Sequence, residues 1–95
     1  MSRLKLIKIG AIWCSGCLVM NNVISKTLKN YSIDFVEYDI DMDEEEAKAY
    51  QPGDVLPVFI VLDGNTEVTR FAGEYSYDAF VQKLTEVGVI HEENH

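Results

Sequence analysis

A Trp-Cys-Ser-Gly-Cys segment at residues 13–17 contains both cysteines of this 95-residue chain, and it constrains the fold more than any other feature. The segment lies where a strand pattern gives way to a helix pattern. Two thiols separated by two residues at a helix start can face each other across one turn. They can then close into a disulfide and open again with little movement of the rest of the chain. The sequence therefore predicts a redox-active dithiol, Cys14 and Cys17, at a strand-to-helix junction.

The residues around the cysteines predict a strand, a helix and a second strand. Residues 4–9 alternate apolar and basic side chains and continue through 10–12, which predicts a strand that ends at the cysteines. The segment 32–40 is rich in Ile, Phe, Val and Tyr and predicts another strand. Between them we expect a helix over about 15–30. Its apolar stripe has spacings of three and four and consists of Cys17, Met20, Ile24 and Leu28.

The middle of the chain predicts a short helix and a buried strand. Asp43 can cap the helix, with Glu46 three residues later in the capping-box position, and the Pro-Gly pair at 52–53 ends it. The run 55–62 is almost entirely apolar, which is typical of a strand buried on both faces.

The last third of the chain predicts a hairpin and a final helix. An Asp-Gly-Asn turn at 63–65 leads into an alternating strand at 67–72. Ser76 can cap the helix and Gly88 can stop it. Residues 89–95 are expected to form a frayed tail. The apolar stripe of the helix consists of Phe80, Leu84 and Val87.

The predicted order of elements is β-α-β-α-β-β-α, which defines an α/β fold. A helix joins the first two strands, so these strands must be parallel, and such a crossover is almost always right-handed. The last two strands form an antiparallel hairpin. We expect a single domain over residues 1–95, because the chain is too short for two cores. The expected product is a four-stranded mixed sheet flanked by helices on both faces.

The net charge of −8 and the pattern of the first residues narrow the expected partners. The negative charge disfavours nucleic acids and anionic membranes as partners. No apolar run approaches the roughly 20 residues that span a bilayer, and the first residues lack the apolar stretch of a signal peptide. We therefore expect a cytoplasmic protein, in which close thiols are more often catalytic or metal-binding than structural.

The acidic residues are unevenly distributed. Eight of the 16 lie between Glu37 and Asp54, against a single base, Lys48. One side of the molecule is therefore predicted to be strongly negative. Two interpretations remain open: a solvated face that favours solubility, or a surface that steers a basic partner toward the protein.

Together these features resemble the thioredoxin family. The resemblance rests on the order of elements, on the Trp-Cys-x-Gly-Cys segment after the first strand, and on the proline of Leu-Pro-Val at 56–58. It covers roughly residues 4–88 and implies a thioredoxin-like fold. The chain lacks the additional N-terminal strand and helix of full-length thioredoxins, so it resembles the minimal form that glutaredoxins share.

The helix start and the resemblance together predict the roles of the thiols. Unpaired N–H groups and the positive end of the helix dipole favour a thiolate at Cys14 over Cys17, which lies one turn further in. As in the family, Cys14 is expected to attack a substrate disulfide, and Cys17 to resolve the mixed disulfide. Gly16 is expected to leave room for the partner's backbone. Trp13 either offers a flat apolar docking surface or packs in the core.

The resemblance also implies a substrate-binding edge. In the family the proline that corresponds to Pro57 is cis and packs against the dithiol. The residue before it, Leu56 here, pairs its backbone with an extended substrate. Gly73 matches the family glycine that lets the substrate backbone approach. The alternative for Pro57 is a trans proline at the start of a strand.

One charged pair departs from the family pattern. Thioredoxins usually carry a buried acid six residues before the nucleophile, near a lysine of the next parallel strand. The corresponding residues here are Lys8 and Glu37, so the charges are exchanged. Lys8 under the dithiol would favour a thiolate, and Glu37 could accept or return the proton of Cys17. The alternative is that the Lys8 ammonium reaches solvent.

Two further roles for the cysteine pair are a structural disulfide and a metal site. The closed loop is too short for much entropic stabilisation by a disulfide. A zinc site would need His91 and His95 as its remaining ligands. The alternating aspartates at 39–43 lack the glycine and glutamate of a calcium-binding loop. We predict no metal and no bound cofactor.

The resemblance implies a thiol–disulfide oxidoreductase that reduces disulfide-containing protein substrates. Its electrons are expected from an upstream, thioredoxin-reductase-like enzyme. Ser15 and Gly16 differ from the residues between the cysteines of ordinary thioredoxins and glutaredoxins, which leaves the direction of electron flow open. Two alternatives remain. One is a glutaredoxin-like enzyme that uses glutathione, and the other is a non-catalytic adaptor whose acidic face binds a basic partner.

Overall fold

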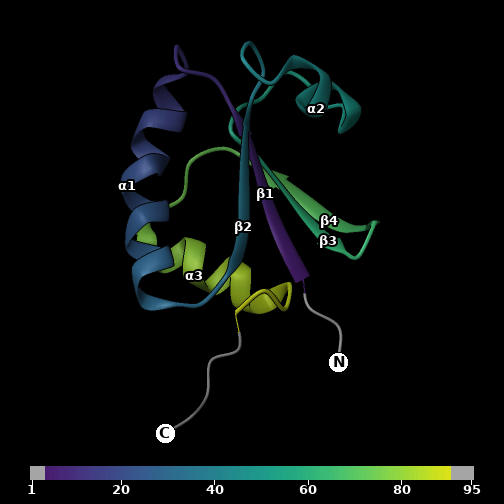
Figure 1. The fold of residues 1–95 in the computed structure, drawn as a ribbon. Coiled ribbons are helices and arrows are strands. Elements are labelled where there is room, and N and C mark those ends of the chain that lie inside the picture. The colour runs from purple at the N-terminus through teal and green to yellow at the C-terminus, as the bar shows by residue number, and fades with distance from the viewer. Residues whose placement is uncertain (1–3, 91–95) are drawn as a thin grey trace, which may run out of the picture.

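The computed structural model describes residues 4–90, in which four strands and three helices follow the predicted order (Figure 1). Within these residues, no helix has both the length and the apolar character needed to cross a bilayer. The elements are β1 (Leu4–Gly10), α1 (Ser15–Asn30), β2 (Asp34–Asp39), α2 (Glu44–Ala49), β3 (Val58–Asp63), β4 (Thr66–Ala72) and α3 (Tyr77–Glu86).

The strands form one mixed sheet in the order β2-β1-β3-β4. β1 is parallel to β2, and β3 is antiparallel to both of its neighbours, β1 and β4. The register places Lys8 of β1 beside Glu37 of β2 and beside Phe59 of β3. The predicted α/β fold with a four-stranded mixed sheet is confirmed.

Helices cover both faces of the sheet, as predicted. α1 and α3 lie together on one face, and α2 lies on the other, near the end of the sheet where β1 and β2 finish (Figure 1). Under α1 and α3 the core contains the side chains of Leu6, Met20, Phe59, Phe80 and Leu84. Under α2 it contains those of Ile7, Ile9, Ala47, Val58 and Ile60. Because apolar side chains of β1 and β3 point to both faces, these central strands are buried on both sides.

Several predicted strand boundaries differ from the observed ones. β3 begins at Val58 rather than at residue 55, because Pro57 has no N–H to donate to a strand ladder and Val55 is exposed. β1 ends at Gly10, two residues before the predicted end, and β2 is shorter than the predicted 32–40 at both ends.

The predicted stripe of α1 is wrong at its last member. Leu28 is 37% exposed, whereas Thr27 is 1% exposed. The buried face is centred near Met20, and at 100° per residue Leu28 falls at its edge. Thr27 tolerates burial because its hydroxyl donates a hydrogen bond to the Val23 carbonyl at 2.8 Å.

The two predicted N-caps have different outcomes. The Ser76 hydroxyl accepts a hydrogen bond from the Ala79 N–H at 3.2 Å, so this cap is confirmed. Asp43 is the N-cap residue of α2, as predicted, but its side chain makes no hydrogen bond to the helix. Its carboxylate instead accepts the backbone N–H of Asp39 at 2.9 Å, which fixes the loop between β2 and α2. The predicted capping interaction at Asp43 is therefore wrong.

The predicted frayed tail is wrong for its first two residues. Gly88 has a φ of 89° and ends the last helix as expected. The N–H groups of Val89 and Ile90 then both donate to the Leu84 carbonyl, at 2.9 and 3.2 Å, and Ile90 is buried in the core. The remaining tail residues, His91 and His95 among them, lie outside the described residues.

Candidate active site

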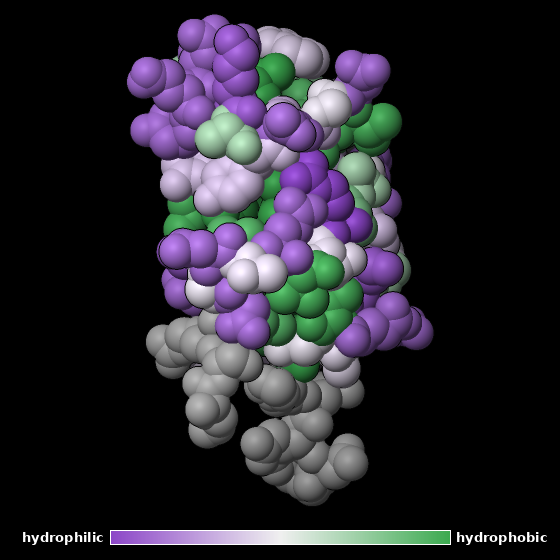
Figure 2. Space-filling model, turned by 90° about the vertical axis from the view of Figure 1, so that its right-hand side faces the viewer, coloured by the Kyte–Doolittle hydropathy of each residue, from purple (hydrophilic) through white to green (hydrophobic). Residues whose placement is uncertain are grey.

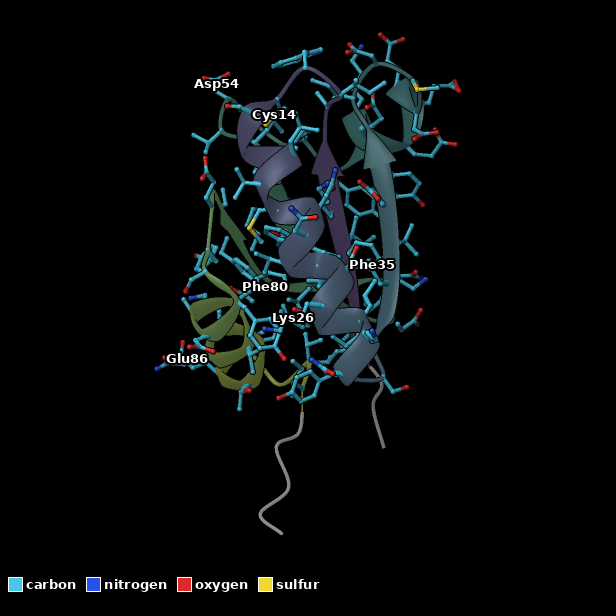
Figure 3. The ribbon with its side chains drawn as sticks, turned by 90° about the vertical axis from the view of Figure 1, so that its left-hand side faces the viewer. Cys14, Lys26, Phe35, Asp54, Phe80 and Glu86 are labelled. Carbon is cyan, nitrogen blue, oxygen red and sulfur yellow. The ribbon has the colours of Figure 1, made fainter. Side chains whose placement is uncertain are left out.

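The two cysteines meet at the start of α1, at the end of the molecule that also carries α2 (Figures 1 and 3). Cys14 is the N-cap residue, and its sulfur accepts the backbone N–H of Cys17 at an S–N distance of 3.2 Å. Both are unpaired thiols, with 9% of Cys14 and 2% of Cys17 exposed. N–H groups at a helix start stabilise negative charge on a sulfur that they contact. The Cys14 sulfur therefore lies at the helix start, and the Cys17 thiol is enclosed one turn further in.

Burial controls the chemistry of the inner thiol. It is the main cause that raises the pKa of Cys17 from 9.0 to about 11, and the hydrogen bond and charge of Cys14 raise it as well. A backbone hydrogen bond with Ala11 and the positive charge of Lys8 act in the opposite direction. Cys17 is therefore a neutral thiol near pH 7 and must lose its proton before it can attack another sulfur.

The loop before β3 lies against Cys14. The Cys14 thiol donates to the Leu56 carbonyl at 3.6 Å, and the Leu56-Pro57 peptide is cis, as the resemblance implied. Gly73 lies next to this loop, since its backbone N–H donates a hydrogen bond to the Pro57 carbonyl at 2.9 Å. Its φ of 99° favours glycine, and no atom lies within 4 Å of the position that a Cβ would take. The fold thus brings Cys14, Leu56, Pro57 and Gly73 together with open space beside Gly73.

Trp13 lies on the surface beside Cys14. It is 67% exposed, so the alternative of core packing is wrong. Its indole N–H donates to the Asp41 carboxylate at 2.7 Å, which holds the ring against the loop after β2. Three apolar side chains near the cysteines or the loop before β3 are also more than half exposed: Ile12, Leu18 and Val55. The dithiol is therefore accompanied by exposed apolar side chains. One of them is the Trp13 ring, which Asp41 holds in place.

Gly16 lies under the side chain of Glu74, a residue of the loop between β4 and α3. A Cβ on Gly16 would lie 3.1 Å from a Glu74 carboxylate oxygen and 3.5 Å from the Leu56 carbonyl oxygen. The contact with Glu74 would require a small shift of its side chain, and the contact with Leu56 is an ordinary van der Waals distance. Because Gly16 has no side chain, the loop before β3 and the loop after β4 can both pack closely against the first turn of α1.

Lys8 is buried beneath the dithiol. It is 2% exposed, so the alternative that its ammonium reaches solvent is wrong. The ammonium donates to the Glu37 carboxylate at 2.8 Å and to the Asn21 side-chain oxygen at 3.0 Å. Glu37 itself is 53% exposed. The structure therefore brings the predicted Lys8–Glu37 pair together, with the lysine enclosed and the carboxylate at the surface.

Four residues at the site were missed by the sequence analysis. Gly10 sits where β1 passes under α1, and Asn21, Asp41 and Glu74 supply contacts to Lys8, Trp13 and Gly16, respectively. Asn21 is one helical turn after Cys17, a spacing that could have placed it on the same face. The other three come from separate segments, and nothing in their local sequence marks them. These residues are Gly10, Asn21, Asp41 and Glu74.

The acidic segment lies next to this site. Its three consecutive glutamates, 44–46, form the exposed first turn of α2. Figure 2 shows hydrophilic side chains gathered at the upper end of the face on which α2 lies. The exposure of these glutamates agrees with a solvated acidic face, whereas the steering of a basic partner stays a prediction.

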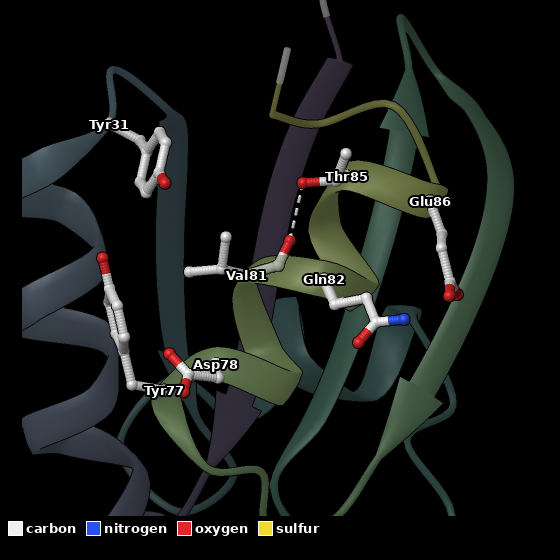
Figure 4. Close-up of a pocket in the computed structure, with 7 residues that line it drawn as sticks. All are labelled: Tyr31, Tyr77, Asp78, Val81, Gln82, Thr85 and Glu86. Carbon is white, nitrogen blue, oxygen red and sulfur yellow. Dashed lines mark hydrogen bonds between the residues drawn. The ribbon is translucent and has the colours of Figure 1, made fainter. Parts of the chain in front are cut away.

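Beyond the dithiol, the described residues show a groove but no cluster of metal ligands. Among residues 4–90 no group of three or more His, Cys, Asp or Glu side chains is arranged to hold a metal ion. A shallow groove of about 370 Å³ lies between the end of α1 and α3, lined by residues that include Tyr31, Tyr77 and Gln82 (Figure 4). Glu86, which also lines it, lies at the opposite end of the molecule from Cys14 (Figure 3). The groove is therefore separate from the dithiol.

The family model named Thioredoxin matches residues 1–86. The chain belongs to the thioredoxin family. The resemblance predicted from the cysteine segment and the order of elements is thereby confirmed, and the paired cysteines at the helix start fit the disulfide oxidoreductases that this family typically contains.

Solved thioredoxins share the fold. A thioredoxin from Nicotiana alata is 28% identical, with a TM-score of 0.78 over 90% of this chain and 74% of that one. Thioredoxin-2 of the malaria parasite is 22% identical, with a TM-score of 0.78 over 90% of this chain and 84% of that one. A Schistosoma mansoni thioredoxin is 24% identical, with a TM-score of 0.76 over 90% and 79% of the two chains. No curated protein matches the sequence.

Proposed function

We propose that this thioredoxin-family protein reduces protein disulfides through Cys14 and Cys17. One observation carries the proposal: the Cys14 sulfur caps α1, where it accepts the Cys17 N–H at 3.2 Å, while Cys17 itself is enclosed. Reduction by dithiol exchange needs an outer sulfur that is stabilised as a thiolate and an inner thiol within reach of it. The start of α1 supports this proposal, because it offers a backbone N–H to the Cys14 sulfur and encloses Cys17 within reach of it.

The proposed reaction has two exchange steps. The Cys14 thiolate attacks one sulfur of the substrate, so a Cys14–substrate disulfide forms as the substrate S–S bond breaks, and the leaving thiolate takes a proton from solvent. Cys17 then loses its proton to solvent and attacks the Cys14 sulfur. The Cys14–Cys17 disulfide forms and the second substrate thiol is released. The substrate gains two electrons and the protein loses two.

The substrate is proposed to bind as an extended segment along the edge formed by Leu56 and Gly73. An extended peptide can pair its backbone there as an added strand. The open space at Gly73 leaves room for that backbone. The exposed Trp13 ring offers apolar contact on the other side of Cys14.

The oxidised protein must be reduced again for the next cycle. We propose a thioredoxin-reductase-like enzyme as the electron donor and the cytoplasm as the compartment, because thiols there are kept reduced. Both proposals follow from the family. A reductase would dock on the exposed side chains beside the dithiol, among them Ile12 and Trp13.

Insulin reduction with dithiothreitol as electron source tests the function. We expect activity in the wild type and none in Cys14→Ser. Cys17→Ser is the informative partner variant. Reduced first and then mixed with insulin after the dithiothreitol is removed, it should stop after the first step and accumulate a covalent mixed disulfide with the substrate. Ser15→Ala, at an exposed position between the two thiols, is the matched control and should retain activity.

The alternatives make different predictions in the same experiment. Reduction of glutathione mixed disulfides without insulin reduction would overturn the proposal in favour of a glutaredoxin-like enzyme. Inactivity on both substrates would also overturn it and would leave the adaptor interpretation of the acidic face. Retained insulin reduction in Cys14→Ser would contradict the assigned nucleophile.

A further inference from the structure

Lys8 is a buried charge that the proposed reaction does not yet use. It is among the largest fully buried side chains of the described residues and lies on β1, six residues before Cys14. Removal of an ammonium from water is costly, so a buried lysine needs close partners to remain charged. Two are present: the Glu37 carboxylate at 2.8 Å and the Asn21 amide oxygen at 3.0 Å.

The two charges of this pair have different surroundings. Lys8 is enclosed, whereas the Glu37 side chain is 53% exposed. Water screens the carboxylate far more than the ammonium, because the effective dielectric constant is higher at the surface. A net positive potential from Lys8 therefore persists inside the protein despite the ion pair.

That potential acts on Cys17. The position that a Cβ on Gly10 would take is 2.9 Å from the Cys17 sulfur and 3.3 Å from Lys8 Cε. The end of the Lys8 side chain and the Cys17 sulfur are therefore near neighbours beside Gly10. Asn21 follows Cys17 by one turn of α1 and holds the ammonium against the underside of that helix. In agreement, the charge of Lys8 lowers the pKa of Cys17 while burial raises it.

We propose that the Lys8 ammonium is a positioning charge that stabilises the Cys17 thiolate as it forms and thereby speeds the second exchange step. The inference rests on the proposed function and deepens it. In that step the Cys17 proton leaves to solvent, the Cys17 sulfur bonds to the Cys14 sulfur, and the bond from Cys14 to the substrate breaks. A fixed, enclosed cation opposes the cost of negative charge on a buried sulfur. Attack by Cys14, which is already stabilised by the helix start, does not depend on it.

A neutral aromatic disulfide, dithiodipyridine, separates the two steps because each releases one absorbing thiopyridone. In a single turnover with excess reagent, the first release depends on reagent concentration and the second does not. The second is the intramolecular attack by Cys17 on the Cys14 mixed disulfide. Cys17→Ser, which should lack the second release, identifies the phases.

Two variants distinguish an electrostatic role of Lys8 from a merely structural one. Lys8→Met keeps the length of the side chain but removes its charge, and the half-exposed Glu37 carboxylate that loses its partner remains hydrated. Glu37→Gln removes the opposing negative charge, while Asn21 and the new amide oxygen can both still accept hydrogen bonds from the ammonium. We expect Lys8→Met to slow the second release about tenfold, the effect of one unit in the pKa of a thiol. Glu37→Gln should speed it, because the carboxylate no longer offsets the charge of Lys8, whereas a Glu37 that accepted the Cys17 proton would make this variant slower. The first release should be unaffected in both.

Each other outcome overturns the inference. Equal slowing in both variants would mean that the ion pair acts through structure or that Glu37 takes the Cys17 proton. An unchanged second release in Lys8→Met would mean that its charge has no role. Slowing of the first release as well would place the effect at Cys14 or in the fold. A wild type that releases no thiopyridone would instead contradict the proposed function, so the two failures are distinguishable. Circular dichroism of both variants is the control for folding.

Discussion

The Cys17 sulfur leaves no room for a side chain on Gly10, where a Cβ would lie only 2.9 Å from it. This contact joins the end of β1 to the first turn of α1 directly under the dithiol. Lys8 lies on the other side of the same point, with Cε 3.3 Å from the Cβ position. Gly10 therefore sets how closely the resolving thiol approaches the strand that carries the buried ammonium.

Gly10→Ala is expected to destabilise the protein by about 1–3 kcal/mol, the usual cost of an extra methyl group in a packed interior. Because the displaced atom is the Cys17 sulfur, the second exchange step should slow as well. Denaturant unfolding measures the first effect and the two-phase thiol release the second. The control is Gly10→Ala in a Cys17→Ala background, where the contacted sulfur is absent and the cost should shrink. An equal cost in both backgrounds would show that the sulfur is not the obstacle.

Asp41→Ala should separate substrate binding from stability. The carboxylate accepts the indole N–H of Trp13 at 2.7 Å, but both residues are exposed, so unfolding free energy should change by less than about 1 kcal/mol. With the ring no longer held, KM for a protein disulfide should rise severalfold, while reaction with a small disulfide stays the same. Steady-state insulin reduction beside dithiodipyridine reduction measures the difference. The acidic Asp54→Ala serves as a charge control, and an equal rise in KM there would assign the effect to charge alone.

The sequence predicted the fold and the dithiol because both depend on local patterns. Alternating and uniformly apolar strands, a helical stripe and turn residues each act within a few positions, and together they leave few possible topologies. Cys14 and Cys17 are three residues apart, so their proximity follows from helix geometry alone. The errors are also local. The run at 55–62 continues through Pro57, and apolar character could not show that the strand begins after the proline.

The contacts around the dithiol could not be predicted in the same way, because they join distant segments. Asp41 reaches Trp13 from the loop after β2, and Glu74 reaches Gly16 from the loop after β4. Lys8 shows which part of a contact the sequence can predict and which part it cannot. Its register beside Glu37 follows from two parallel strands, but whether the ammonium is enclosed depends on Asn21 and the helix above it.

The stability of the reduced protein should fall in alkaline solution because of Cys17. Its pKa is about 11 in the folded chain and 9.0 without the influence of the fold. Below pH 9 both states hold the proton; as the pH rises toward 11 the unfolded chain ionises first, so folding stability is lost, by about 3 kcal/mol in total. Other groups titrate in this range, so the measurement is the difference between wild type and Cys17→Ser in unfolding free energy from pH 8 upward. A difference that does not change with pH would contradict the raised pKa.

Gly16→Ala should keep or raise stability while it impairs the reaction with protein substrates. Alanine favours a helix by up to about 1 kcal/mol over glycine. The tightest contacts of the new methyl group are with the exposed Glu74 side chain, 3.1 Å away, which can move aside. The same methyl group would lie 3.5 Å from the Leu56 carbonyl oxygen, on the edge proposed to pair with substrate backbone. KM for insulin should therefore rise severalfold, with little change in single-turnover reaction with dithiodipyridine. Gly16→Ala combined with Glu74→Ala separates the causes: if removal of the Glu74 side chain restores KM, the displaced carboxylate rather than the methyl group hinders the substrate.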